Sequence, residues 1–315
     1  MLRLIGHIDL PEHVKPGGFD HAAIHAGMSR LYVAHTANDA LDIIDCADER
    51  YLQSVPGLSG VAGALVAEQL NLIFTSNRGE NTVGIFAPGD EGSVVKIPVG
   101  MRPNGLAFDP QRGLLLAANV GDPAIPNSFT LSVVDVTQRK MIHSIPVPRR
   151  TRWTIFDPQT NAFYVNIADP AQIVVLDASQ PKRVIRAFAI PAAGPHGLDL
   201  DTGNSRLFCA CDAARLITVA ISSGEILGEA ELSGTPDVIF FNPALHHLYV
   251  AIGDPGVIDV FDTADLHRIE TLATEKDAHT IAFDAARNKV YAFLPQTHRA
   301  AVFIDEGQGV SHGSE

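Results

Sequence analysis

Seven positions recur along this chain at intervals of about 42 residues, a period within the range of known structural repeats, and six of them carry polar side chains. The seven positions are Asp20, Ala62, Asn104, Arg152, His196, Asp237 and His279. The spacing is nearly even, and the longest step is the one from Asn104 to Arg152. Imidazole and carboxylate groups transfer protons and ligate metals, and a guanidinium holds anions. A fold that brings these positions together would therefore create one reactive or binding site.

Each repeat contains short strand patterns, and these elements must position the polar side chains. Runs rich in Val, Ile, Leu and aromatic residues are bounded by Gly, Pro, Asn and Asp, as strands are bounded by turns. The clearest are the second strands of the repeats, at 30–35, 72–77, 114–119, 162–167, 206–211, 247–252 and 289–294. A fixed period of this length, built from short strands, predicts a β-propeller with one four-stranded blade per repeat. We expect an all-β fold, a seven-bladed propeller forming a single domain over residues 1–305.

The ends of the chain indicate how the ring closes. The seventh repeat stops after its third strand, at Asp305, and residues 2–11 match the pattern of the missing fourth strand. We expect this N-terminal strand to complete the last blade, which removes an exposed sheet edge. Residues 306–315, EGQGVSHGSE, have the composition of a disordered tail.

Several repeat segments resemble the YVTN-type, lactonase-like propeller repeats. The second strands LYVAH, FYVNI and LYVAI carry this resemblance, as do the first-strand segments PNGLAFDP and PHGLDLD. It covers residues 2–305 and implies the fold. Propellers of this kind include lactonases, lyases of the virginiamycin B lyase type and proteins with no known chemistry, so the resemblance leaves the activity open. The P-R-H segment of the sugar-phosphate lactonases is missing, and no catalytic residue of that family is carried over.

In a propeller the innermost strands run along a central channel. The starts of the first strands and the ends of the second strands therefore open onto the same rim. The recurring positions should meet there, together with residues that follow the second strands: His35, Asn77, Arg78, Asn119, Asp169, Asp212, Asp254 and His298. In the first blade a one-residue slip decides whether Asp20 or His21 faces the channel, because side chains alternate along a strand.

Two kinds of chemistry suit such a cluster. Imidazoles and a carboxylate are a normal donor set for a divalent metal ion, and the candidate ligands are His21, His35, His196, Asp237 and His279. Alternatively His196 or His279 acts as a general base while Arg152 holds a substrate anion. Candidate substrate-binding residues are Arg78, Asn104, Asn119 and Trp153. The structural alternative is a polar, water-filled channel that carries out no chemistry. For Trp153, the structural alternative is packing between blades.

Other recurring or reactive residues are expected to be structural. The Asp that ends the third strand in five repeats precedes a turn, where it accepts backbone N–H groups: Asp45, Asp135, Asp177, Asp262 and Asp305. Cys209 and Cys211 alternate along one strand and are expected to be buried hydrophobic residues. His25 is expected to be structural, and His246, His247 and His267 to be solvated. The extra length of the third repeat falls in the loop 119–129, a candidate binding loop or a neutral insertion.

Composition limits the choice of partners. The formal net charge of −13 argues against nucleic acid as a partner, although Arg78, Arg149, Arg150 and Arg152 could form a local basic pocket. There is no C-x-x-C-H haem motif and no nucleotide-binding fingerprint, so neither haem nor nucleotide is expected. Without a signal peptide or an apolar run long enough to span a membrane, the sequence predicts a cytoplasmic protein with no membrane partner.

These observations favour an enzyme whose active site lies at the mouth of the central channel. The expected reaction is a metal-assisted lyase or a lactone or ester hydrolase reaction on a small anionic substrate. The alternative is a non-catalytic propeller scaffold that binds a protein or peptide on one rim.

Overall fold

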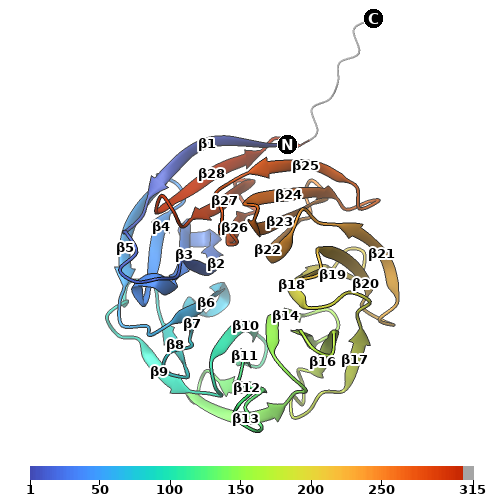
Figure 1. Ribbon diagram of the computed structural model, residues 1–315. Coiled ribbons are helices and arrows are strands. Elements are labelled where there is room, and N and C mark those ends of the chain that lie inside the picture. The colour runs from blue at the N-terminus through green and yellow to red at the C-terminus, as the bar shows by residue number, and fades with distance from the viewer. Residues whose placement is uncertain (308–315) are drawn as a thin grey trace, which may run out of the picture.

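Seven four-stranded antiparallel sheets surround a central channel in the computed structural model, which describes residues 1–307 (Figure 1). Each sheet is one blade, and its strands are hydrogen-bonded to one another in order from the channel outward. The seven-bladed propeller predicted from the repeat is therefore confirmed. Over residues 1–307, no helix is long and apolar enough to cross a membrane.

The strands fall into four concentric positions. The innermost are β2 (Phe19–His25), β6 (Val61–Ala67), β10 (Pro103–Asp109), β14 (Thr151–Asp157), β18 (Pro195–Asp201), β22 (Thr235–Asn242) and β26 (Ile281–Asp284). The second are β3 (Arg30–His35), β7 (Leu72–Asn77), β11 (Leu114–Asn119), β15 (Ala162–Ile167), β19 (Arg206–Cys211), β23 (His247–Asp254) and β27 (Lys289–Leu294). The third are β4 (Ala40–Asp45), β8 (Thr82–Phe86), β12 (Thr130–Asp135), β16 (Gln172–Asp177), β20 (Arg215–Ala220), β24 (Val257–Asp262) and β28 (Arg299–Asp305). The outermost are β5 (Arg50–Val55), β9 (Val95–Pro98), β13 (Lys140–Pro146), β17 (Arg186–Ala189), β21 (Ile226–Glu231), β25 (Arg268–Ala273) and β1 (Leu2–Asp9). Three short 3-10 turns complete the described chain: η1 (Ala26–Met28), η2 (Thr36–Asn38) and η3 (Glu68–Leu70).

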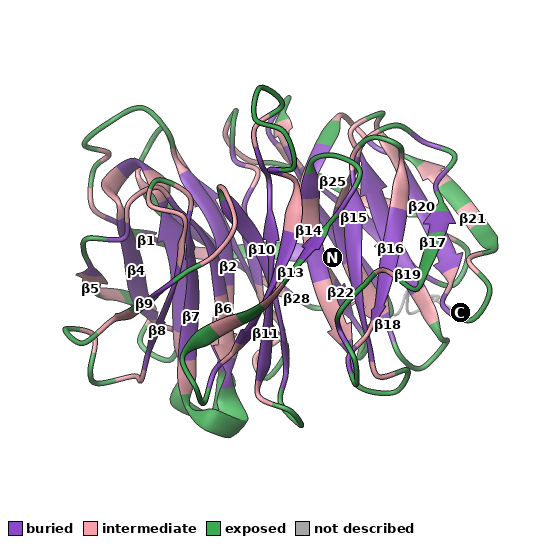
Figure 2. Ribbon diagram, turned by 90° about the horizontal axis from the view of Figure 1, so that it is seen from below, coloured by how far each residue is buried: buried purple, intermediate pink, exposed green. Residues whose placement is uncertain are grey.

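The hydrophobic core lies between neighbouring blades. Because side chains alternate along a strand, each middle strand contributes to two such cores. On β3, Leu31 and Val33 pack in one core, while Tyr32 and Ala34 pack in the next. The middle strands are accordingly buried on both faces, and the exposed residues gather in the loops and outer strands (Figure 2). This packing holds the inner strands, and hence the channel, in place.

Cys209 and Cys211 lie in one and the same interblade core, as their alternation along β19 predicted. Both thiols are fully buried, and their sulfur atoms are 3.9 Å apart. Burial raises the pKa of the Cys209 thiol well above its usual range. The two residues therefore act as small hydrophobic side chains.

The ring closes through the N-terminal strand, as predicted. Strand β1 pairs antiparallel with β28, which places Leu2 opposite Asp305. Asp305 is buried and accepts hydrogen bonds from His247 Nδ1 at 2.6 Å and the Tyr249 hydroxyl at 2.7 Å. The N-terminal amine lies 3.0 Å from the same carboxylate. The N-terminus, the seventh blade and the sixth blade therefore meet at the buried carboxylate of Asp305.

His247 was predicted to be solvated, and that prediction is wrong. Its exposure is 2%, because it begins β23 on the side that faces Asp305 of the next blade. The prediction that the Asp ending five of the third strands accepts backbone N–H groups is confirmed. The donors are Ala47 and Asp48 for Asp45, Gln138 for Asp135, Ser179 for Asp177, Ala264 for Asp262 and Gly307 for Asp305.

The first two residues of the predicted disordered tail are held by the N-terminus. Arg3 pairs with Glu306 at 2.7 Å, and the N-terminal amine donates to the Gly307 carbonyl at 2.6 Å. The rest of that predicted tail, 308–315, lies outside the described residues.

Candidate functional site

A β-bulge lies at the recurring polar position of most inner strands. The register with the second strand shifts between Phe19 and Ala22, and between Thr151 and Thr154, with the equivalent shift in β6, β10, β18 and β22. A bulge re-aims side chains, so two consecutive residues approach the channel from one strand. Asp20 and Arg152 line one end of the channel, whereas the next residues along, His21 and Trp153, line the other end. The choice between Asp20 and His21 is thereby resolved: both reach the channel, at different ends.

The first end is a polar cavity of about 460 Å³, which we call the polar mouth. Its charged and amide side chains are Asp20, Arg78, Asn104, Arg150, Arg152, His196, Asp237, Asp277 and His279. Every polar recurring position of the repeat is in this set. The period of the sequence therefore predicted which side chains meet, even from opposite sides of the ring.

His196 lies between two carboxylates in the polar mouth. Its Nδ1 is 2.7 Å from Asp212 Oδ1, and its Nε2 is 3.1 Å from Asp237 Oδ1. Burial disfavours the charged ring, but the two carboxylates outweigh this and raise the pKa of His196 to about 9. His196 is therefore an imidazolium near neutral pH. Arg152 Nη1, at 2.9 Å from Nε2, is then a like-charge neighbour that the carboxylates compensate.

Asp237 also contacts the second histidine of the site. Its Oδ2 lies 2.9 Å from His279 Nδ1, as a charge pair rather than a well-directed hydrogen bond. Burial disfavours charge on both groups. The attraction between opposite charges is stronger: Asp237 raises the pKa of His279, and His196 followed by His279 holds the pKa of Asp237 well below its usual range. The His279 side chain is 35% exposed, so its ring remains open to the cavity.

Positive charge gathers at this mouth. Arg78 pairs with Asp20 at 3.0 Å, and Arg152 pairs with Asp212 at 3.1 Å. Arg150 makes no side-chain hydrogen bond or ion pair with any residue in 1–307. Burial, followed by repulsion from Arg152, Arg78 and Arg102, lowers the pKa of Arg150. The Nε atoms of Arg78 and Arg152 are buried without an acceptor among the described residues. In a chain of net charge −13, this is a local excess of donors and positive charge.

Some predicted site residues lie elsewhere. His35 is fully buried in the first blade, where its Nδ1 is 2.7 Å from Asp42, and it packs against Phe19. Asn119 is also fully buried and donates to Thr130 and Ser132 of β12. Both side chains end a second strand and turn between strands instead of toward the channel. The insertion loop supplies no lining residue of the polar mouth between positions 120 and 129.

Three of the five donors predicted for a metal ion converge, namely His196, Asp237 and His279, and the other two lie elsewhere. His35 is in a blade core, His21 lines the far end of the channel, and both nitrogens of His196 contact carboxylates. Within residues 1–307, no group of three or more His, Cys, Asp or Glu side chains is arranged to hold a metal ion. The five predicted ligands therefore do not form one metal site in the described chain.

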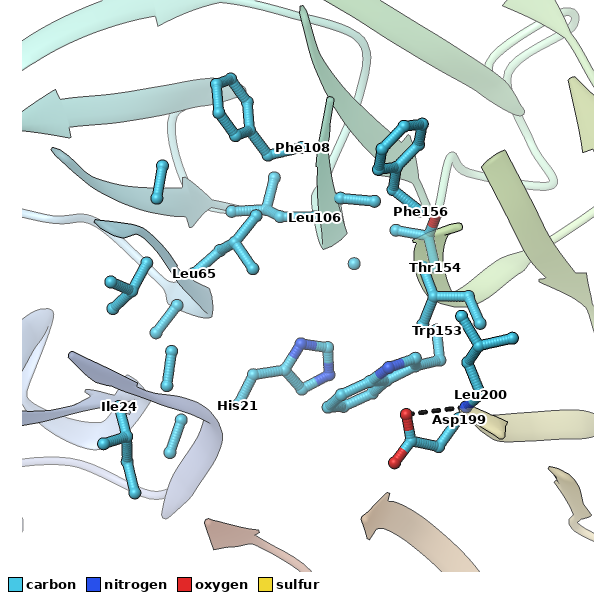
Figure 3. A pocket seen from close by; sticks show the side chains of 18 of the residues that line it. His21, Ile24, Leu65, Leu106, Phe108, Trp153, Thr154, Phe156, Asp199 and Leu200 are labelled. Atoms are coloured by element: carbon cyan, nitrogen blue, oxygen red, sulfur yellow. Dashed lines mark hydrogen bonds between the residues drawn. The ribbon is translucent and has the colours of Figure 1, made fainter. Parts of the chain in front are cut away.

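The other end of the channel is apolar. Trp153 and His21 lie at its floor with ring centroids 4.1 Å apart, and leucine and phenylalanine side chains form the walls (Figure 3). Trp153 also packs against two interblade cores. Trp153 thus lies between blades and beside a cavity, but that cavity is not the polar mouth.

The role of Asp212 was missed at the level of sequence. It follows β19 and was one of eight residues expected at the rim, without a function of its own. In the structure it contacts both His196 and Arg152. Its spacing from His196 along the chain, 16 residues, is that of a first strand and the loop after the second strand, which is the signal that could have found it.

Comparisons with known proteins support the fold. No family model matches the chain, and no curated protein matches it either. Solved structures similar to this chain at a TM-score of 0.79 include one titled as the mitotic checkpoint complex, with 8% identity over 96% of this chain and 91% of the other. Hydrazine synthase of Kuenenia stuttgartiensis is 12% identical over 94% of this chain and 97% of its own, also at 0.79. The WD40 β-propeller domain of Doa1 is 11% identical over 97% of each chain, again at 0.79. At these identities the likeness shows the propeller fold alone, and the YVTN-type family stays a prediction.

Proposed function

We propose that this chain is a propeller scaffold whose polar mouth binds a small anionic molecule, such as a carboxylate or a phosphate. One observation carries the proposal: Arg150 lines the cavity without a partner in the described chain, next to Arg78 and Arg152. A bound anion would offset the repulsion among these guanidinium groups and accept from their free donors. The imidazolium of His196 adds a further positive charge to the same cavity.

In the catalytic form of this proposal, His279 is the residue that transfers a proton. Asp237 orients the ring through Nδ1, and its negative charge favours the protonated form of the ring. A protonated imidazole open to the cavity would act as a general acid toward a leaving oxygen, while Arg152 and His196 stabilise negative charge on the substrate. Hydrolysis of a lactone or ester, or elimination from a carboxylate, are the reactions that suit this arrangement.

Thermal unfolding in the presence of anions tests the binding proposal. Citrate or inorganic phosphate at about 100 times its Kd should stabilise the folded state by about 2.7 kcal/mol, a rise in Tm of about 4 °C. Arg150→Gln should abolish the rise. Arg183→Gln, an exposed arginine of another loop, is the matched control and should keep it. An equal rise in Arg150→Gln and the control, or no rise in the wild type, would refute the anion site.

The catalytic form needs a separate test. Initial rates on a panel of carboxylate-bearing lactones and esters should fall by about 100-fold or more in His279→Gln, the usual range for loss of a general acid. Anion binding measured by the thermal shift should survive in that variant. A rate that His279→Gln leaves unchanged would show that His279 is not the general acid.

The comparisons favour a second function, that of a protein-binding scaffold. Two of the similar structures are a checkpoint complex and a WD40 domain, so this fold occurs as part of protein assemblies. For this chain, the proposal predicts that a pull-down with the purified protein recovers one partner in stoichiometric amount. Crosslinks from that partner should map to the rim loops, and Arg150→Gln should not weaken its binding.

A further inference from the structure

The apolar end of the channel is a cavity that the proposed function does not use. Its volume is about 630 Å³, which is within the range of small-molecule sites. It shares no lining residue with the polar mouth. Its walls come from the inner strands and include Leu65, Leu106, Phe108, Phe156, Leu200 and Phe240 (Figure 3). Aromatic and aliphatic walls of this kind favour an apolar ligand body.

His21 presents an unpartnered nitrogen to this cavity. Its side chain is 7% exposed, and its Nε2 lies 3.3 Å from Asp20 Oδ1. Its Nδ1 has no hydrogen-bond partner among residues 1–307. Burial lowers the pKa of His21, so the ring is neutral near pH 7. Because Nε2 faces a carboxylate, the proton belongs on Nε2, and Nδ1 is left as an acceptor.

Asp199 is the second ionisable group of this cavity. Its Oδ1 accepts the Leu200 N–H at 2.8 Å, and its Oδ2 accepts the Phe241 N–H at 2.6 Å. Asp199 has no ion pair with a basic residue in the described chain. Asp199 lines the cavity, and burial raises its pKa to about 7. Each oxygen keeps a lone pair for a further donor.

We propose that this cavity is a second ligand site, which takes a small aromatic or alkyl ammonium compound. The two ionisable groups of the cavity, His21 and Asp199, are hydrogen-bond acceptors, so a ligand that brings a donor can satisfy them. An ammonium group supplies the donor, and it also supplies the positive charge with which the Asp199 carboxylate can form an ion pair. The aromatic rings of Trp153, Phe108 and Phe156 suit the apolar body and attract a cation through their faces. An anionic ligand has no donor for these acceptors and would be repelled by the carboxylate.

Trp153 provides a direct test, because it is the one Trp of the chain and lies at the floor of the cavity. The probe is 4-phenylbutylamine, and the matched neutral compound is 4-phenyl-1-butanol. At pH 8 the wild type should bind the amine about ten-fold more tightly than the alcohol, as measured by fluorescence titration. In Asp199→Asn the two affinities should become equal, since a hydrogen bond to a charged group contributes about 1.5–3 kcal/mol, or about ten-fold and more. Asp135→Asn, which also removes a carboxylate that accepts a backbone N–H, is the control and should behave as the wild type.

A second variant locates the binding. Ala23 lines the same cavity, so Ala23→Leu should narrow it and weaken both compounds by about ten-fold. An unchanged amine affinity in Ala23→Leu would place the compound elsewhere and overturn the proposal. So would equal affinities for amine and alcohol in the wild type, or no fluorescence change at millimolar amine.

The pH dependence of the wild type keeps the test informative if Asp199→Asn does not fold. From pH 6 to pH 8 the amine affinity should rise by about ten-fold as Asp199 loses its proton, while the alcohol affinity stays constant. The other ionisable groups near Asp199 are Asp201, which is paired with Arg206 at 2.8 Å, and His21 across the channel. Both have lowered pKa values, so Asp201 stays ionised throughout this interval and the midpoint of His21 lies below pH 6.5. A flat amine profile would refute the role of Asp199.

Discussion

The two carboxylates that flank His196 lead to a prediction about a single pKa. Asp237→Asn keeps the shape of the side chain and removes its charge. Asp237 Oδ1 lies 3.1 Å from His196 Nε2, so the variant removes one of the two groups that hold the proton on the ring. Asp212, at 2.7 Å from Nδ1, is left to oppose burial and the charge of Arg152.

The magnitude follows from the pKa of His196, which is raised from 6.5 to about 9. One pKa unit corresponds to about 1.4 kcal/mol, so the surroundings favour the imidazolium by about 3 kcal/mol over the ring in water. Burial is the largest opposing effect and persists in the variant. We therefore expect the pKa of His196 to fall by about two units in Asp237→Asn, to near 7.

The pKa can be read from the ring carbon-bound proton of ¹³C-labelled histidine by NMR, with His196→Gln supplying the assignment. The stability of the protein gives an independent measure. A histidine whose pKa is higher in the folded state contributes stability below pH 6.5, and this contribution is lost as the pH rises through about 9. The raised pKa of His279 adds in the same direction. Between pH 6.5 and 9.5 the unfolding free energy of the wild type should fall by about 3 kcal/mol more than that of Asp237→Asn, as measured in urea.

Two outcomes would refute this reasoning. The first is a pKa of His196 below about 7 in the wild type, which would show that burial outweighs the carboxylates. The second is a pKa that Asp237→Asn changes by less than about half a unit, which would show that Asp212 alone holds the proton. Asp135→Asn should alter neither the pKa nor the slope of stability with pH.

The remaining predictions concern ring closure and the inner strands. Asp305→Ala leaves His247 and Tyr249 buried without their acceptor and should lower the unfolding free energy by about 3–5 kcal/mol, whereas Tyr249→Phe should lower it by about 1–2 kcal/mol, both measured in urea. A cost for Asp305→Ala no larger than that of an exposed Asp→Ala change would contradict the closure described. A methyl group on Gly197 would collide with the Asp237 carbonyl oxygen, so Gly197→Ala should cost about 1–3 kcal/mol and shift the pKa of His196, and an unchanged NMR titration would count against this contact.

Sequence alone was sufficient for the fold, because the evidence for it is local and repeated. The second strands at 30–35 and 289–294 have the observed boundaries of β3 and β27. Seven copies of one pattern at one spacing leave few arrangements in which every strand is paired. The closure by residues 2–11 followed from counting strands, and the pairing of Leu2 with Asp305 confirms it.

The polar mouth could be predicted in outline for the same reason. Positions that recur with the period of the blade lie at one height in the ring, so His196, Asp237 and His279 meet although they belong to three successive blades. The repeat spacing does not predict the direction in which each side chain points. His35 ends a second strand at the level of the rim and still points into a blade core, where Asp42 holds it.

The tertiary structure decided the division of the channel and the charges within it. The bulges of the inner strands send Asp20 and Arg152 to one end and His21 and Trp153 to the other, and a bulge depends on pairing with the neighbouring strand. The protonation of His196 depends on one carboxylate of its own blade and one of the next, which only the packed blades bring within 3.1 Å of the ring. Residue types and spacing therefore determined which groups are available, and contacts between blades determined where each points and which charge it carries.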